Sequence, residues 1–152
     1  MIPSILDRLN KLSSSLWMPH APAATAEELA TIERALGVVL PTDYRQLMAI
    51  TNGFGLYAYR TRLYLQSAED VIWYTEDYRE HLPGMFLIGN DEGDNTFYYD
   101  PANRLGKGAY AVFMVELGSV GFPYSKHAAA HVTELLEKII AGESIWDYPH
   151  LG

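Results

Sequence analysis

The chain has 152 residues, 49% of them hydrophobic, which is typical of one folded domain with an apolar core and argues against a disordered segment. Eleven lysines and arginines against nineteen aspartates and glutamates give a formal net charge of −8, so a nucleic-acid backbone would be repelled and nucleic-acid binding is not expected. The chain contains no cysteine, which excludes disulfides and thiolate chemistry.

Residues 1–24 predict a short N-terminal helix, over residues 3–12, and a linker rather than a second domain. Asp7 interrupts the apolar pattern, and no segment approaches the ~20 apolar residues of a membrane span, so we expect neither a signal peptide nor membrane contact. Together with the absence of cysteine, this favours a cytoplasmic protein whose main domain covers residues 25–152.

A helix with clear end signals is predicted to begin near Ala26. Thr25 followed by Glu28 is a capping box, in which the threonine hydroxyl and the glutamate carboxylate each bind a backbone amide at the start of the helix. Apolar side chains then recur at helical spacing, and Gly37 supplies the left-handed residue that ends such a helix.

A second helix is predicted to follow the corner at Pro41. Thr42 can accept backbone amide hydrogen bonds as the N-cap, and Asp43 complements the helix dipole in the first turn. Asn52-Gly53 is expected to close this helix, because both residues tolerate positive φ. The face expected to be buried consists of Tyr44, Leu47, Met48 and Thr51.

Residues 56–65 are predicted to form a single strand, because their side chains divide between two faces at alternate positions. One predicted face consists of Tyr57, Tyr59, Leu63 and Leu65. The other, wetter face consists of Arg60, Arg62 and Tyr64.

Four further elements are predicted along the rest of the chain. Residues 69–79 indicate a helix, and residues 86–99 indicate a β-hairpin around a cluster of Gly, Asn and Asp. Residues 110–115 are apolar on both faces, which is typical of a central strand. A final helix is expected over residues 125–141, with Ser125 as its cap.

The hairpin turn carries three carboxylates, those of Asp91, Glu92 and Asp94, which is more acid than turn geometry requires. The spacing lacks the alternating order of an EF-hand loop and its distant bidentate glutamate, so we do not expect a calcium site. Two interpretations remain open. Asp91 and Asp94 can fold the turn through side-chain hydrogen bonds to the backbone, or the carboxylates can face a partner.

His127, His131 and Glu134 would share one stripe of the predicted last helix, at a spacing that could ligate zinc. This stripe lies about 130° from the centre of the apolar face, so we expect it to face solvent. Glu134 and Lys138 form an ordinary surface pair at i, i+4. The sequence also contains no nucleophile elbow, P-loop, dinucleotide fingerprint or zinc-protease motif. We therefore expect no metal, no cofactor and no enzyme activity.

Two stretches of the chain resemble, in this order, the motifs of the SUKH superfamily, which includes the fungal cell-wall-assembly regulators and many bacterial immunity proteins. The first motif is E-x-x-LG-x-x-LP-x-D-Y followed by NG, and the second is IG-x-D-x-x-GD followed by an aspartate, here with one residue fewer in its loop. The matching residues are Glu33, Leu36, Gly37, Leu40, Pro41, Asp43, Tyr44, Asn52, Gly53, Ile88, Gly89, Asp91, Gly93, Asp94 and Asp100.

Together with the predicted elements, the resemblance implies an α+β fold, in which one domain has a mostly antiparallel β-sheet packed against several helices. As function, the resemblance implies a bacterial immunity protein that binds a cognate toxin, often a nuclease, and neutralises it by stoichiometric occlusion. The alternative is an intracellular scaffold or regulatory module, like the fungal members, without a toxin partner.

An acidic and aromatic surface is the expected binding surface. Eleven tyrosines and three tryptophans favour a protein-interaction role, because these side chains combine a large contact area with a polar tip. Each of them taken singly is more often partly buried in its own domain. A negative surface would also attract a basic toxin. The candidate partner-binding residues are Asp91, Glu92, Asp94, Tyr57, Tyr59, Trp73, Trp146 and Tyr148, with Tyr74 next to Trp73.

Overall fold

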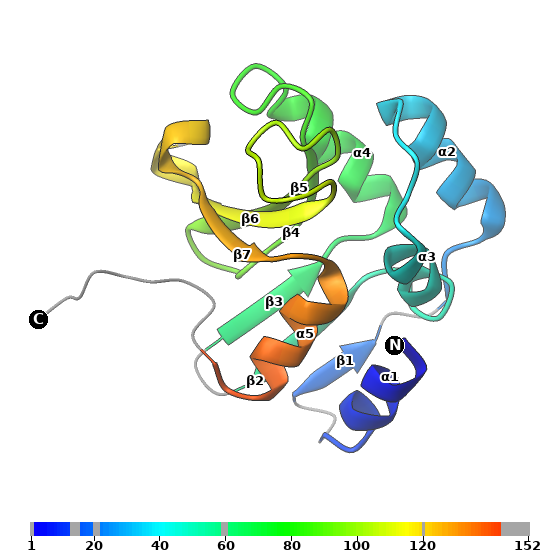
Figure 1. Ribbon diagram of the computed structural model, residues 1–152. Coiled ribbons are helices and arrows are strands. Elements are labelled where there is room, and N and C mark those ends of the chain that lie inside the picture. The colour runs from blue at the N-terminus through cyan, green and yellow to red at the C-terminus, as the bar shows by residue number, and fades with distance from the viewer. Residues whose placement is uncertain (1, 13–15, 20–21, 59–60, 120, 144–152) are drawn as a thin grey trace, which may run out of the picture.

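Seven antiparallel strands in one sheet organise the part of the chain that the structure describes (Figure 1). The structure is a computed structural model, and it describes residues 2–12, 16–19, 22–58, 61–119 and 121–143. The strands lie in chain order, so each one pairs with the next along the sequence. They are β1 (Trp17–Pro19), β2 (Phe54–Ala58), β3 (Thr61–Leu65), β4 (Phe86–Asn90), β5 (Asn95–Asp100), β6 (Ala111–Glu116) and β7 (Lys126–Ala129).

Five α-helices accompany this sheet within the described residues. They are α1 (Ile2–Asn10), α2 (Ala26–Leu36), α3 (Thr42–Met48), α4 (Ala68–Asp77) and α5 (Val132–Ile140). Two short 3₁₀ segments, Leu117–Ser119 and Phe122–Tyr124, lie between β6 and β7. This arrangement confirms the predicted α+β fold with an antiparallel sheet.

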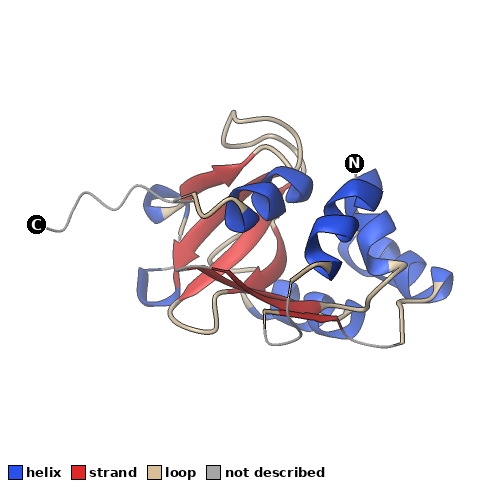
Figure 2. Cartoon of the chain, turned by 90° about the horizontal axis from the view of Figure 1, so that it is seen from below, coloured by secondary structure: helices blue, strands red, loops and turns tan. Residues whose placement is uncertain are grey.

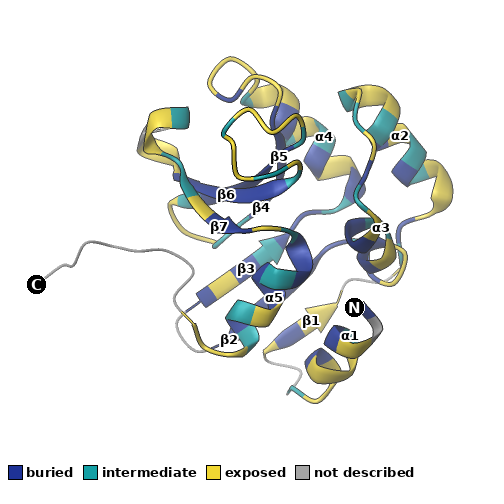
Figure 3. Ribbon diagram, viewed as in Figure 1, coloured by how far each residue is buried: buried dark blue, intermediate teal, exposed yellow. Residues whose placement is uncertain are grey.

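The main hydrophobic core lies on one face of the sheet, where α1, α3 and α5 pack together with buried side chains of α2 and α4 (Figure 3). Successive strand residues point to opposite faces, so Leu56, Leu63 and Leu65 enter this core. The N-terminal segment contributes to it as well, because α1 packs against α5 and β1 pairs with β2. A smaller core on the other face gathers Leu82, Met85, Leu87, Tyr98 and Phe113.

The sheet is only weakly paired between β3 and β4, and α4 lies along the edge of β4 that this leaves open. Only two residue pairs join β3 to β4. The sheet is strongly twisted, so that its strands run at different inclinations (Figure 2). The hydroxyl oxygen of Thr75 on α4 accepts a hydrogen bond from the backbone N–H of Leu87, at 3.0 Å, where a strand would otherwise pair. Where β3 and β4 do meet, a Cβ on Gly89 would lie 2.3 Å from the carbonyl oxygen of Tyr64. Glycine at this position is therefore what allows the strands to meet.

Local signals in the sequence are confirmed most clearly at α2. The Thr25 hydroxyl accepts a hydrogen bond from the N–H of Glu28 at 3.1 Å, and the Glu28 carboxylate accepts one from the N–H of Thr25 at 3.0 Å. Gly37 ends the helix in the left-handed conformation, with φ 66° and ψ 36°. With small shifts of their ends, the structure also confirms the helices predicted at residues 3–12 and 69–79, the hairpin at 86–99 and the strand at 110–115.

The predicted caps of α3 are wrong at both ends. Pro41 is the N-cap and Thr42 is already helical, because the Pro41 carbonyl accepts the first helical hydrogen bond, from the N–H of Arg45. No side chain caps this end. The helix ends at Met48 with Ala49 as its C-cap, so Asn52-Gly53 lies beyond it. Asn52 instead binds the start of α4, where its side-chain oxygen accepts the N–H of Ala68 at 2.8 Å.

The single strand predicted over residues 56–65 is wrong, because this stretch forms the β2–β3 hairpin. Tyr57 is paired with Arg62 across the hairpin. It therefore shares a face with Arg62 and Tyr64, not with Leu63 as predicted. The prediction failed because no Gly, Pro, Asn or Asp marks the reversal, which follows Ala58.

The helix predicted over residues 125–141 is wrong in its first part. Residues Lys126–Ala129 form β7, which pairs with β6, and α5 begins only at Val132. The alanines of this segment favour a helix in isolation, but pairing with the edge of β6 overrides that preference. The stripe of His127, His131 and Glu134 therefore does not exist, since His127 lies on a strand.

Candidate protein-interaction surface

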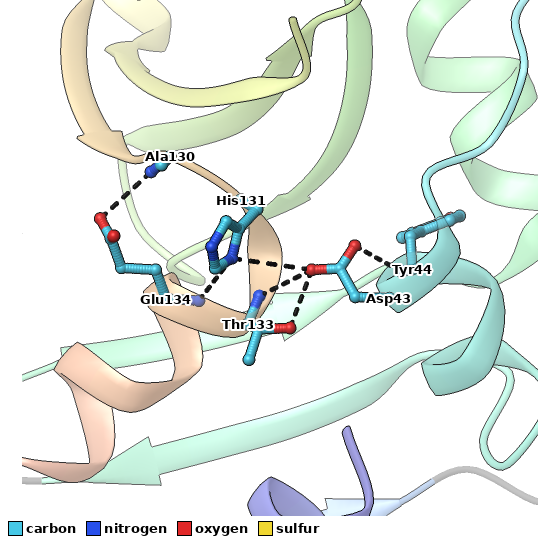
Figure 4. Close-up of polar contacts among 6 residues, drawn as sticks. All are labelled: Asp43, Tyr44, Ala130, His131, Thr133 and Glu134. Atoms are coloured by element: carbon cyan, nitrogen blue, oxygen red, sulfur yellow. Dashed lines mark hydrogen bonds and ion pairs between the residues drawn. The ribbon is translucent and has the colours of Figure 1, made fainter. Parts of the chain in front are cut away.

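The buried carboxylate of Asp43 joins α3 to the start of α5 (Figure 4). One of its oxygens, Oδ2, accepts hydrogen bonds from the backbone N–H and the hydroxyl of Thr133, at 3.1 and 2.8 Å. The other, Oδ1, accepts the N–H of Tyr44 at 2.9 Å. The Nδ1 atom of His131 lies 3.8 Å from Oδ2. Asp43 therefore stabilises the fold by joining two helices. The sequence predicted only its effect on the dipole of its own helix.

His131 is the N-cap of α5, a role that the sequence did not predict. Its Nδ1 accepts the N–H of Glu134 at 3.1 Å, and the Glu134 carboxylate accepts the N–H of Ala130 at 3.1 Å (Figure 4). The hydrogen bond from Ala130, together with Lys138, lowers the pKa of Glu134 below its ordinary value. These polar groups thus stabilise the start of α5.

Other polar residues of the two family-like motifs also bind the backbone. Glu33 accepts the N–H of Leu40 at 2.9 Å and pairs with Arg45 at 3.0 Å, which holds the corner between α2 and α3. Asp100 is fully buried and accepts the N–H groups of Arg104 and Leu105, at 3.0 and 2.8 Å. The side chains of Glu33, Asp43 and Asp100 therefore stabilise the fold and are not free to bind a partner.

Only part of the acidic turn is available to a partner. Asp91 folds the turn, because its Oδ1 accepts the N–H groups of Gly93 and Asn95, at 2.9 and 3.1 Å, and its Oδ2 accepts the side-chain amide of Asn95 at 2.8 Å. The side chains of Glu92 and Asp94 are exposed. Of the two interpretations of the turn, Asp91 thus matches the structural one, and Glu92 and Asp94 remain candidates for binding.

The structure brings two predicted site residues into contact. The hydroxyl of Tyr57 on β2 donates to the carboxylate of Glu92, at 2.7 Å to either oxygen. This hydrogen bond is the main cause that raises the pKa of Tyr57. The guanidinium carbon of Arg62 lies 5.7 Å from the centre of the Tyr57 ring. Glu92 is therefore held beside an aromatic ring on the sheet face that the main core does not cover.

The same surface continues from Tyr57 towards α4. Burial, followed by the carboxylates of Asp70 and Glu92, raises the pKa of Tyr64, so both carboxylates act on its hydroxyl. Tyr74 on α4 adds to this effect. We call the surface formed by Tyr57, Tyr64, Asp70, Tyr74 and Glu92 the acid–aromatic face. Tyr64 and Asp70 were not among the predicted site residues, because only the hairpin and the position of α4 bring them together.

Trp73 lies on α4 next to this face. Its indole is 58% exposed and contacts the ring of Tyr74 edge-on, with the ring centres 4.8 Å apart. The three other predicted aromatic site residues, Tyr59, Trp146 and Tyr148, lie outside the described residues.

Among residues whose positions are described, no group of three or more His, Asp or Glu side chains could hold a metal ion. Nor is any helix within those ranges long and apolar enough to cross a membrane.

A comparison with known protein families identifies the family of this chain. The model of the SMI1 / KNR4 family (SUKH-1) matches residues 23–138, which extend from the capping box of α2 into α5. No curated protein sequence matches the chain.

Proposed function

Because this chain belongs to the SMI1 / KNR4 family (SUKH-1), we propose that it is an immunity protein that binds a protein toxin and neutralises it. The superfamily includes immunity proteins of this kind. The net charge of −8 supports a basic partner, such as a nuclease that itself binds nucleic acid. The mechanism would be stoichiometric occlusion, in which the acidic protein covers the toxin's binding cleft.

The observation that carries this proposal is the difference between two groups of carboxylates. Those of Asp43, Asp91 and Asp100 accept backbone N–H groups and so hold the fold together. The side chains of Glu92 and Asp94 are exposed, and the Glu92 carboxylate accepts its hydrogen bond from the hydroxyl of Tyr57 at the surface. Exposed carboxylates can take the place of phosphates on a basic toxin, and the tyrosines supply contact area with a polar tip.

The test is binding and inhibition by the purified full chain. The candidate toxin is the protein encoded by the reading frame next to this gene. We expect a one-to-one complex in size-exclusion chromatography with light scattering, and loss of the toxin's activity at equimolar ratio. Absence of both binding and inhibition would overturn the proposal. Binding to a neighbour with no toxic activity would favour the alternative, an intracellular scaffold.

A further inference from the structure

A groove of about 310 Å³ lies between α2 and α4 and is lined by residues of both helices. Its lining is mostly apolar and includes the side chains of Ala68, Ile72 and Trp73. The exposed indole of Trp73 forms part of this lining, although the core does not require it there. Large exposed aromatic side chains beside an apolar lining are typical of binding anchors in protein interfaces.

The charged residues that line the groove are all acidic. They are Glu28, Glu69 and Glu76, and no lysine or arginine is among the described residues that line it. Glu28 also caps α2, whereas within the described part of the chain neither Glu69 nor Glu76 forms an ion pair. Three carboxylates around an indole favour a cation, because an ammonium or guanidinium group gains from both the charges and the ring face.

We infer that the α2–α4 groove is the docking site for a basic segment of the toxin, with an arginine or lysine side chain against Trp73 and an apolar neighbour on Ile72. This inference rests on the proposed function and adds a second contact region to it. One helix serves both regions, because α4 presents Asp70 and Tyr74 to the acid–aromatic face and Glu69 and Trp73 to the groove. A single partner lying across α4 would contact both.

The first experiment measures the affinity of the full chain for the toxin by isothermal titration calorimetry. We expect Trp73→Ala to weaken binding by roughly tenfold or more, the usual loss for a buried aromatic anchor. The matched control is Tyr124→Ala, which removes another exposed aromatic side chain, 64% exposed, from the segment that precedes β7. This control should bind as the wild type does.

The second experiment identifies the cation. Glu76→Arg should weaken binding, and reversing the charge of the contacting arginine or lysine on the toxin should restore it. Circular dichroism would verify that each variant is folded. If the wild type binds but Trp73→Ala and Glu76→Arg bind equally well, the groove is not the docking site and the proposed function stands. If the wild type does not bind, the proposed function fails and this inference fails with it.

Discussion

The carboxylate of Asp43 accepts both the backbone N–H and the hydroxyl of Thr133, a residue 90 positions further along the chain. These bonds tie α3, which belongs to the first motif, to α5 near the end of the domain. A buried carboxylate is costly unless it is satisfied by hydrogen bonds, and here two residues satisfy both of its oxygens. Position 43 therefore requires an aspartate for these hydrogen bonds, whereas the sequence alone suggested only a favourable interaction with the helix dipole.

Thr133→Val tests this connection, because valine keeps the shape of threonine and replaces only its hydroxyl with a methyl group. We expect a loss of about 1.5–3 kcal/mol in the free energy of unfolding, the usual contribution of a hydrogen bond to a charged group. The control is Thr31→Val, whose hydroxyl bonds to the Glu27 carbonyl on an exposed surface of α2 and should change stability by less than about 0.5 kcal/mol. Urea denaturation of both variants provides the comparison. Equal losses in the free energy of unfolding would show that the hydrogen bond between α3 and α5 contributes no more than an exposed one.

Alanine substitutions of Leu36 and Leu47 should differ in their effect on stability, because the two leucines are buried to different extents. Leu47 is completely buried, whereas Leu36 is only partly buried against the core. Leu47→Ala should therefore cost about 2–5 kcal/mol, since it leaves a cavity in addition to losing transfer free energy. Leu36→Ala should cost clearly less. Chemical denaturation measures both, and a smaller loss for Leu47→Ala would contradict the packing described above.

Gly89→Ala should disrupt the junction of β3 and β4. The new Cβ would lie 2.3 Å from the Tyr64 carbonyl oxygen, and because this atom belongs to the backbone it cannot move aside cheaply. We expect a loss of at least about 1–3 kcal/mol, as for overpacked cores. Gly118→Ala is the control, because its Cβ would have only the Glu116 side chain nearby, at 3.7 Å. Thermal unfolding should separate the two variants, and comparable melting temperatures would argue against the close approach.

The lowered pKa of Glu134 predicts that its contribution to the free energy of unfolding depends on pH. Its pKa is lower in the folded protein than the ordinary value of 4.5, so its charge stabilises the fold above that value. This contribution is lost as the pH falls through the lowered pKa. Wild type should therefore be more stable than Glu134→Gln at pH 7, and the difference should shrink as the pH falls below 4.5 and through the lowered pKa. Denaturation at a series of pH values measures it.

The control for this pH series is Glu137→Gln, which removes the same charge from an exposed position of the same helix. It should change stability little at any pH, as is usual for exposed substitutions. A stability difference for Glu134→Gln that persisted unchanged into acid would show that charge is not the cause.

The sequence predicts well those features that neighbouring residues determine. The capping box at Thr25 and the left-handed Gly37 are local, and both are found as expected. The reversal before β3 carries no typical turn residue, and the segment before α5 forms β7 by pairing with β6, so local preference is wrong in both places. The same holds for the candidate site. Tyr57 and Glu92 could be chosen singly by residue type, but their contact spans 35 residues and depends on the sheet.

Charge reversal at Glu92 separates binding from folding. Glu92 is exposed, so Glu92→Lys should barely change the free energy of unfolding. Its association with the toxin should slow at low salt, because a cation would replace an anion in front of a basic surface. The defect should shrink as salt is added, since charges are screened over about 8–10 Å at 0.10–0.15 M salt.

The measurement is the association rate of wild type and Glu92→Lys at two salt concentrations, by stopped-flow fluorescence. Glu137→Lys is the matched control, because it makes the same charge change on α5, on the opposite face of the sheet. If position matters, Glu92→Lys slows association much more than Glu137→Lys does. If both variants slow it equally, only net charge steers the toxin. If neither does, the acidic turn lies outside the interface, and Trp73 becomes the leading candidate for the contact.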